Sequence, residues 1–207
     1  MADFPSIPVV ESFTGVNGTT PPNADWTNEL LVRDGLHGFA IQGNAATGRD
    51  SNNEHTAWYN RRIYGPNMAA SIEVPTLPGA TKYVGLLLRT ILPGTANWLA
   101  WGIYLQDNNL KIYRDAPAGA LDTTVSVTWS AGDTLGAVLA GGHIEGWQKS
   151  GGVWTKRAET DHAYAGSAGY AGLWIDGNTG RLDNFSVGAL SDGDIVASRR
   201  RRRRTKG

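Results

Sequence analysis

The stretch Lys82–Arg114, KYVGLLLRTILPGTANWLAWGIYLQDNNLKIYR, decides the fold of this chain. Apolar side chains alternate along it with aromatic, small or polar ones, and successive side chains of a β-strand point to opposite faces. The pattern therefore predicts strands at Lys82–Ile91, Asn97–Gln106 and Leu110–Arg114, separated by Pro-Gly and Asp-Asn turn signals. The apolar face is predicted to carry Val84, Leu86, Leu88, Leu99, Trp101, Ile103 and Leu105. The opposite, mixed face carries Arg89, Trp98 and Tyr104, and a ligand is expected there.

The same strand signal recurs at intervals of roughly 8–12 residues, and nowhere do apolar residues keep a helical spacing for more than about two turns. Further strands are predicted at Val9–Thr14, Glu29–Arg33, Gly38–Gln42, His55–Asn60, Met68–Val74, Thr124–Trp129, Thr134–Ala140, His143–Lys149, Val153–Ala158, Gly169–Ile175 and Arg181–Val187. The second and third of these are expected to form a hairpin across Asp34-Gly35, and the polar segment Gly43–Glu54 an exposed loop. This set of short strands predicts an all-β sandwich or jelly roll.

Length and composition favour one domain with short extensions. The 207 residues suit a single β-sandwich with a sizeable core, and the absence of Cys excludes disulfides and thiolate metal sites. No apolar run approaches the ~18 residues of a membrane span, and the first residues lack the features of a signal peptide. We predict an N-terminal arm at residues 1–8, a β-sandwich at 9–190, and a linker with a basic tail at 191–207.

The formal net charge of zero hides a strong asymmetry. Seven basic residues and no acidic one lie in the last ten positions: Arg199, Arg200, Arg201, Arg202, Arg203, Arg204 and Lys206. Without them 12 basic residues face 19 acidic ones, so the body carries a charge near −7. The guanidinium groups of the tail are expected to pair bidentately with carboxylates on an acidic protein surface. Salt-dependent binding to nucleic acid phosphates and a merely solvated tail are the alternatives.

Several pieces of sequence, in their order, carry a family resemblance. They are a first strand ending in Phe13, Trp26 followed by LLVRDGLHG, then YVGLLLRT, DHAYAGSAGYAGL and the closing RLDNFSVG. Together they resemble the concanavalin A-like jelly roll of the LamG or laminarinase type. The resemblance implies two antiparallel sheets of six or seven strands, with the first and last strands adjacent. Single-domain chains with this ending also resemble minor tail or capsid decoration proteins of tailed bacteriophages, which implies a place in a virion.

Sugar-binding members of this family stack pyranose rings on aromatic side chains of one sheet face. The residues predicted for such a glycan platform are Trp98, Tyr104, Arg89, Asn97 and Trp147. The ring faces would cover sugar C–H groups, and Arg89 and Asn97 would donate to hydroxyls. The alternative is that these rings pack beneath loops or against another subunit.

A metal is also implied by the resemblance, since many such folds hold a structural Ca²⁺ between the first and last strands. Glu11 and Asp183 match those positions, and carboxylate oxygens suit calcium. Ordinary hydrogen bonding at a sheet edge is the alternative. The four histidines show no zinc-binding spacing.

Catalysis is not expected. Related retaining glycosidases carry paired carboxylates on one strand, and Lys82–Arg114 has no such pair. Glu145 stands alone in the sequence, Asp161 and His162 are read as surface residues, and no Gly-x-Ser-x-Gly elbow occurs. The sequence predicts a non-enzymatic virion structural protein whose jelly roll contacts host-surface glycans, whose tail binds other virion proteins, and which forms homo-oligomers. A free carbohydrate-binding module, or less plausibly a glycan hydrolase, is the alternative.

Overall fold

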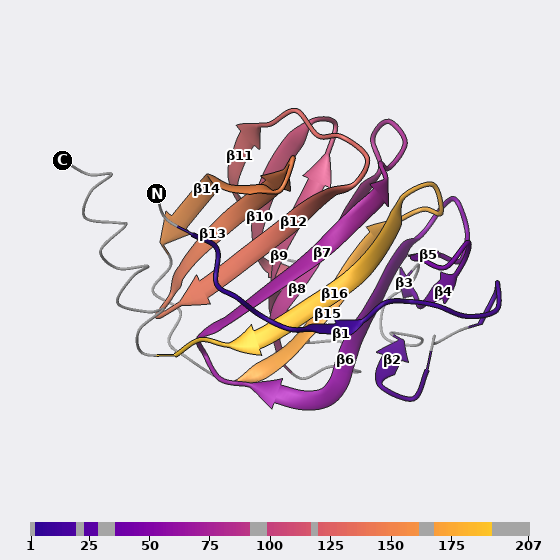
Figure 1. Cartoon of the computed structure of the whole chain (residues 1–207), viewed down its shortest axis with the longest axis horizontal. Helices are drawn as coiled ribbons and strands as arrows, with labels where there is room; N and C mark the ends of the chain where they lie inside the picture. The colour runs from indigo at the N-terminus through magenta and orange to yellow at the C-terminus, as the bar shows by residue number, and fades with distance from the viewer. Residues whose placement is uncertain are drawn as a thin grey trace.

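The computed structural model describes residues 3–19, 23–28, 36–91, 99–116, 120–161 and 168–191, and all regular structure in these ranges is β-strand. The strands form two sheets, here called sheet A and sheet B (Figure 1). Sheet A has the order β14 (Val153–Asp161), β13 (His143–Ser150), β12 (Asp133–Ala140), β7 (Met68–Thr76), β16 (Arg181–Ala189), β5 (Ala46–Gly48) and β4 (Phe39–Ile41), and β1 (Val9–Glu11) also pairs with β16. Sheet B has the order β11 (Ala120–Ser126), β10 (Asn109–Ala116), β9 (Leu99–Gln106), β8 (Tyr83–Ile91), β15 (Gly169–Asp176), β6 (Glu54–Tyr64) and β2 (Trp26–Asn28), and β3 (Leu36–His37) also pairs with β6.

The predicted fold class is confirmed: the chain is an all-β sandwich of two sheets whose pairings are antiparallel, apart from the short parallel contact of β3 with β6. The first and last strands are adjacent, as the resemblance implied, with Glu11 of β1 opposite Phe185 of β16. No helix among the described residues is long and apolar enough to cross a bilayer.

The stretch that decided the fold forms the centre of sheet B. Leu86 of β8 lies opposite Ile103 of β9, which lies opposite Ile112 of β10. All three side chains are completely buried and face sheet A, so the predicted alternation is confirmed. Trp101, which the sequence places on the apolar face, is also buried there, and so is Trp129.

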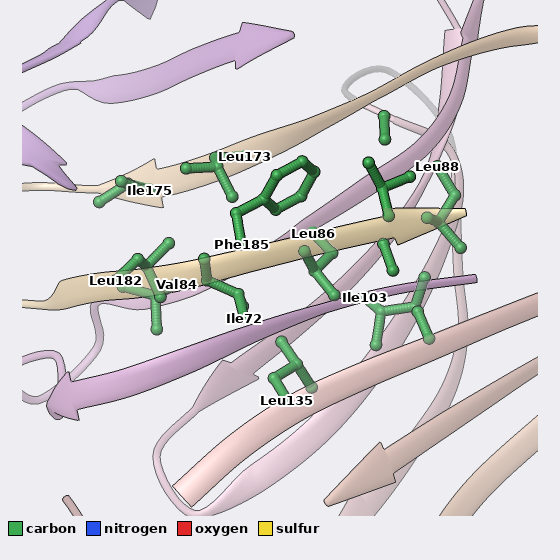
Figure 2. Packing of buried hydrophobic residues seen from close by; sticks show 14 of the residues in the cluster. Ile72, Val84, Leu86, Leu88, Ile103, Leu135, Leu173, Ile175, Leu182 and Phe185 are labelled. Carbon is green, nitrogen blue, oxygen red and sulfur yellow. The ribbon is translucent and has the colours of Figure 1, made fainter. Parts of the chain in front are cut away.

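Phe185 occupies the middle of the core between the two sheets (Figure 2). Its ring lies 5.1 Å from that of Trp26, and the ring of Phe13 lies 5.3 Å from the same indole. Aromatic residues from both ends of the described chain therefore pack around one tryptophan. This packing holds β1 and β16 against β2 of the opposite sheet.

Of two local predictions between residues 29 and 54, the hairpin lies partly outside the described residues and stays a prediction, and the exposed loop needs correction. Phe39–Ile41 pairs with Ala46–Gly48, and residues 29–35 of the expected hairpin lie outside the described residues. Ala45–Gly48 is buried rather than part of an exposed loop, since Ala46 pairs with Leu182 of β16. Thr47 supports this placement, because its hydroxyl donates to the carbonyl of Gly180 at 2.9 Å.

Candidate functional site

The outer face of sheet A is crossed by the N-terminal arm, residues 3–8, which runs from the region of β14 to β1 beside β16 (Figure 1). Phe4 stacks on Trp154 of β14 with 4.0 Å between ring centroids, and its edge meets Trp147 of β13 at 6.0 Å. Ile7 packs against this same outer apolar cluster. The arm therefore lies on the sheet, and aromatic contacts fix its position.

A groove of about 500 Å³ runs between this arm and sheet A. Many of the side chains that line it are polar, and Trp154 contributes an aromatic ring. Glu73 of β7 accepts a hydrogen bond from the side-chain amide of Asn184 at 2.7 Å, and Lys149 lies 5.9 Å from the Trp154 ring centroid. Other polar lining residues are Ser71, Thr134 and Ser186. Hydroxyl, amide, carboxylate and ammonium groups beside one aromatic ring suit a polyhydroxylated ligand.

A second polar group on the same face is the His143 cluster, formed by His143, Glu145, Glu159, Asp161 and Lys156. Asp161 accepts a hydrogen bond from Nδ1–H of His143 at 2.7 Å, while Nε2 of His143 lies 3.5 Å from Oε1 of Glu145 and from Oε2 of Glu159. Nζ of Lys156 pairs with Glu159 and lies 3.7 Å from Glu145. Burial by itself lowers the pKa of His143, but Glu145 and Asp161 outweigh it and raise that pKa above its usual value.

A β-bulge brings the His143 cluster together. Next to the turn, Trp147 pairs with Lys156, but beyond the bulge Glu145 pairs with Glu159 and His143 with Asp161. The extra residue shifts the register by one, so that H-x-E of β13 and E-x-D of β14 share the outer face. Glu145, which stands alone in the sequence, is therefore one member of a five-residue cluster. Its other oxygen accepts from Nε1–H of Trp147 at 3.1 Å.

The outer face of sheet B carries an aromatic cluster instead. The Tyr104 ring lies 4.9 Å from Tyr83 and 5.4 Å from Trp174, and Tyr113 packs at its edge. Glu54 accepts hydrogen bonds from the Tyr83 hydroxyl and from the Trp174 indole N–H. Burial raises the pKa of Tyr104 to about 12. Only 7% of Tyr104 is exposed, so its ring faces mostly contact other rings.

The structure does not bring the predicted glycan-binding residues to one surface. Tyr104 lies on the outer face of sheet B and Trp147 on the outer face of sheet A, with the core between them. Arg89 is 4% exposed and adopts φ of 53° where the pairing of β8 with β9 is irregular. Asn97 and Trp98 lie outside the described residues, as do His162 and the basic residues Arg199–Arg204. A glycan role for these residues stays a prediction.

The predicted calcium ligands lie on adjacent strands near a third carboxylate. Burial raises the pKa of Asp183, and the charges of Glu73 and Glu11 add to the effect against a hydrogen bond from the Asn184 backbone. The Glu11 carboxylate accepts from Ser12 N–H at 3.0 Å and from the Trp26 indole at 3.3 Å. Ca²⁺ takes six to eight oxygens. Glu11 and Asp183 do not by themselves fit that need, and calcium at this position stays a prediction.

The comparisons with known proteins bear on the fold. No protein-family profile matches the sequence, and no curated protein matches it either. Solved structures do match. The carbohydrate-binding module CBM66 from Bacillus subtilis has a TM-score of 0.63 and 12% identity, over 80% of this chain and 96% of that one.

The exoplasmic/lumenal domain of VIP36, in a Ca²⁺- and Man2-bound form, has a TM-score of 0.58 and 9% identity, over 88% of this chain and 87% of that one. The fold is that of the lectin-like jelly rolls. The GH43 protein BlXynB from Bacillus licheniformis also matches, with a TM-score of 0.51 and 12% identity, but only over 37% of its length and 80% of this chain. Identities this low establish the shared fold alone.

The sequence reasoning missed the residues that make the two polar sites of sheet A. Trp154 and Glu73 were read only as parts of strands, because the groove depends on where the arm lies. The H-x-E and E-x-D pairs on the two sides of Gly151-Gly152 were a usable signal for the His143 cluster. Without the bulge, however, a count from the turn would have set Thr160 opposite His143.

Proposed function

We propose that this protein is a non-enzymatic glycan-binding component of a tailed-bacteriophage virion, with a jelly-roll head and a cationic C-terminal anchor. The observation that supports the glycan part most is the groove of about 500 Å³ between the arm and sheet A. It combines an aromatic ring with convergent polar side chains on a fold shared with CBM66 and with VIP36 in its Man2-bound form. The virion part rests on the resemblance and on the charge asymmetry of the sequence.

The groove has the chemistry that sugars require. A sugar offers apolar C–H faces and many hydroxyls, so a site for it needs an aromatic surface with donors and acceptors around it. Trp154 supplies the first through the part of its half-buried ring that Phe4 leaves uncovered, and Glu73, Asn184 and Lys149 supply the second. Tyr104 on the other face is less suitable, because neighbouring rings already cover most of it.

The test of glycan binding is a glycan array probed with the full chain, followed by titration of any glycan that binds. We expect Trp154→Ala to weaken binding by about tenfold or more, equivalent to at least ~1.4 kcal/mol. Val153→Ala, at an exposed side chain next to Trp154 that is not part of the groove lining, is the control and should retain the affinity. Trp98→Ala run in parallel tests the platform predicted from the sequence.

Each outcome of this test has a meaning. Loss of glycan binding in Trp154→Ala supports the groove as the binding site. Loss only with Trp98→Ala overturns the groove but keeps glycan binding. No binding of any glycan by the intact chain would contradict the proposed function.

The anchor is tested separately by deleting residues 198–207. The deletion removes seven positive charges from a chain whose remaining body is near −7, so an attachment made by these arginines should be lost. We expect the shortened protein to fold and to fail to enter particles, measured as copies per purified virion. Unchanged occupancy would remove the anchor from the account, and a wild-type chain that never enters particles would favour a free carbohydrate-binding module.

A further inference from the structure

The His143 cluster plays no part in the proposed glycan binding. His143 and Glu145 are 7% and 0% exposed, so an imidazole and a carboxylate are withdrawn from water at the centre of this cluster. Buried ionisable groups need partners, because leaving them unpaired costs free energy. Glu145 has the Trp147 indole N–H at 3.1 Å.

Nε2 of His143 has no hydrogen-bond partner among the described residues. Since a carboxylate can only accept, the 2.7 Å contact with Asp161 places the proton on Nδ1 and leaves a lone pair on Nε2 when the ring is neutral. That lone pair faces Oε1 of Glu145 and Oε2 of Glu159, at 3.5 Å from each. Three electron-pair donors thus converge on one small volume.

We propose that His143, Glu145 and Glu159 bind a divalent transition-metal ion of the zinc class, with Asp161 orienting the imidazole. Zn–N and Zn–O bonds of ~2.0–2.2 Å place neighbouring ligands of a tetrahedral ion about 3.4 Å apart. The two separations of 3.5 Å match that spacing, and all three ligand atoms lie within 4.8 Å of one another. One imidazole with two carboxylates suits zinc better than calcium, which prefers oxygen alone.

Asp161 completes the pattern that metal-binding histidines show. Such a histidine almost always donates its other N–H to a carboxylate or carbonyl, which fixes the tautomer and the orientation of the ring. The Nδ1–H to Asp161 contact does this for His143. Asp161 is at the end of β14, so the sheet positions the orienting carboxylate along with the ligands.

The net charge of the cluster also favours a divalent cation. Glu145, Glu159 and Asp161 carry three negative charges, and Lys156 is the one permanent cation that these contacts include. Metal binding requires that His143 give up any proton on Nε2, and with the ring neutral the group carries −2, which a divalent ion would cancel. The ammonium of Lys156 already pairs with Glu159, so the ion must displace it toward solvent. Lys156 therefore competes with the metal ion for the carboxylate of Glu159.

The experiment is a titration of the metal-free full chain, without a polyhistidine tag, with zinc chloride by calorimetry. Wild-type protein should bind one ion. Glu159→Gln should weaken binding at least about 100-fold, because loss of an orienting partner alone, as in Asp161→Asn, typically costs 10–100-fold. Lys156→Met should strengthen binding several-fold. Asp122→Asn, which removes a carboxylate of sheet B paired with Arg114, is the matched control and should leave affinity unchanged.

A second readout separates binding from folding. Co²⁺ in place of zinc should give the visible absorption bands of a tetrahedral ion in the wild type and not in Glu159→Gln, whose side chain is partly exposed and whose fold should persist. Wild-type protein that binds no zinc, or binds it equally after Glu159→Gln, would overturn the proposal. Unchanged zinc affinity in Lys156→Met would contradict the claim that the Lys156 ammonium and the ion compete for the same carboxylate. Neither result depends on glycan binding.

Discussion

Phe185→Ala is expected to lower the free energy of unfolding by about 3–5 kcal/mol, the usual cost of truncating a buried aromatic ring. Phe185 is completely buried, and its ring contacts Trp26 at 5.1 Å and Tyr59 at 6.0 Å. The cavity would lie between strands of both sheets (Figure 2). For a chain of this size each kcal/mol lowers Tm by ~2–4 °C, so a fall of more than about 6 °C is expected in calorimetry.

The matched control for Phe185 is Ile63→Ala, at a large apolar side chain that is 55% exposed. It should change stability by no more than about 0.5 kcal/mol. If Phe185→Ala does not fold, Phe185→Leu should give a smaller loss that can be measured. Equal effects at positions 185 and 63 would contradict the described core.

Gly172→Ala should destabilise the protein by about 1–3 kcal/mol or more, the range for forcing atoms into a packed site. A Cβ at Gly172 in β15 would lie 2.3 Å from the carbonyl oxygen of Ala57 in β6, and a backbone oxygen in a sheet has little freedom to move. Separation of β15 from β6 would disturb the middle of sheet B. Urea unfolding measures the loss as a lower midpoint.

Two other glycines calibrate that result. A Cβ at Gly65 meets nothing within 4 Å, so Gly65→Ala should be neutral or slightly stabilising. At Gly146 the nearest atom, at 2.5 Å, is a methyl carbon of Leu110, and a side chain can turn away. The expected order of destabilisation is therefore Gly172, then Gly146, then Gly65. The absence of a loss at Gly172 would contradict the close approach of β15 to β6.

The sequence predicted most of the strands because alternation along one strand is a local property. Leu86 and Leu88 were assigned to the core and Tyr104 to the outer face, and the structure places them so. The buried segment Ala45–Gly48 was missed because small residues give no hydrophobic alternation. It is buried by what packs over it, which only the tertiary structure determines.

The candidate sites were harder to predict, for a related reason. Alternation shows that Tyr104 and Trp147 each leave the core, but it does not show that their strands belong to different sheets. The His143 cluster depends on a one-residue bulge, and the groove depends on an arm that lies on sheet A. Both are consequences of register and topology that the spacing of residues within one strand does not contain.

The central claim, a glycan site on the outer face of sheet A, is tested most directly by the indole N–H signals in NMR spectra. Titration of the full chain with a glycan found on the array should shift the signal of Trp154, and leave that of Trp174 on sheet B unchanged. Trp174 is the proper reference because its indole N–H is held by Glu54 in the aromatic cluster of the other face. A shift of Trp174 with Trp154 unmoved would contradict the account.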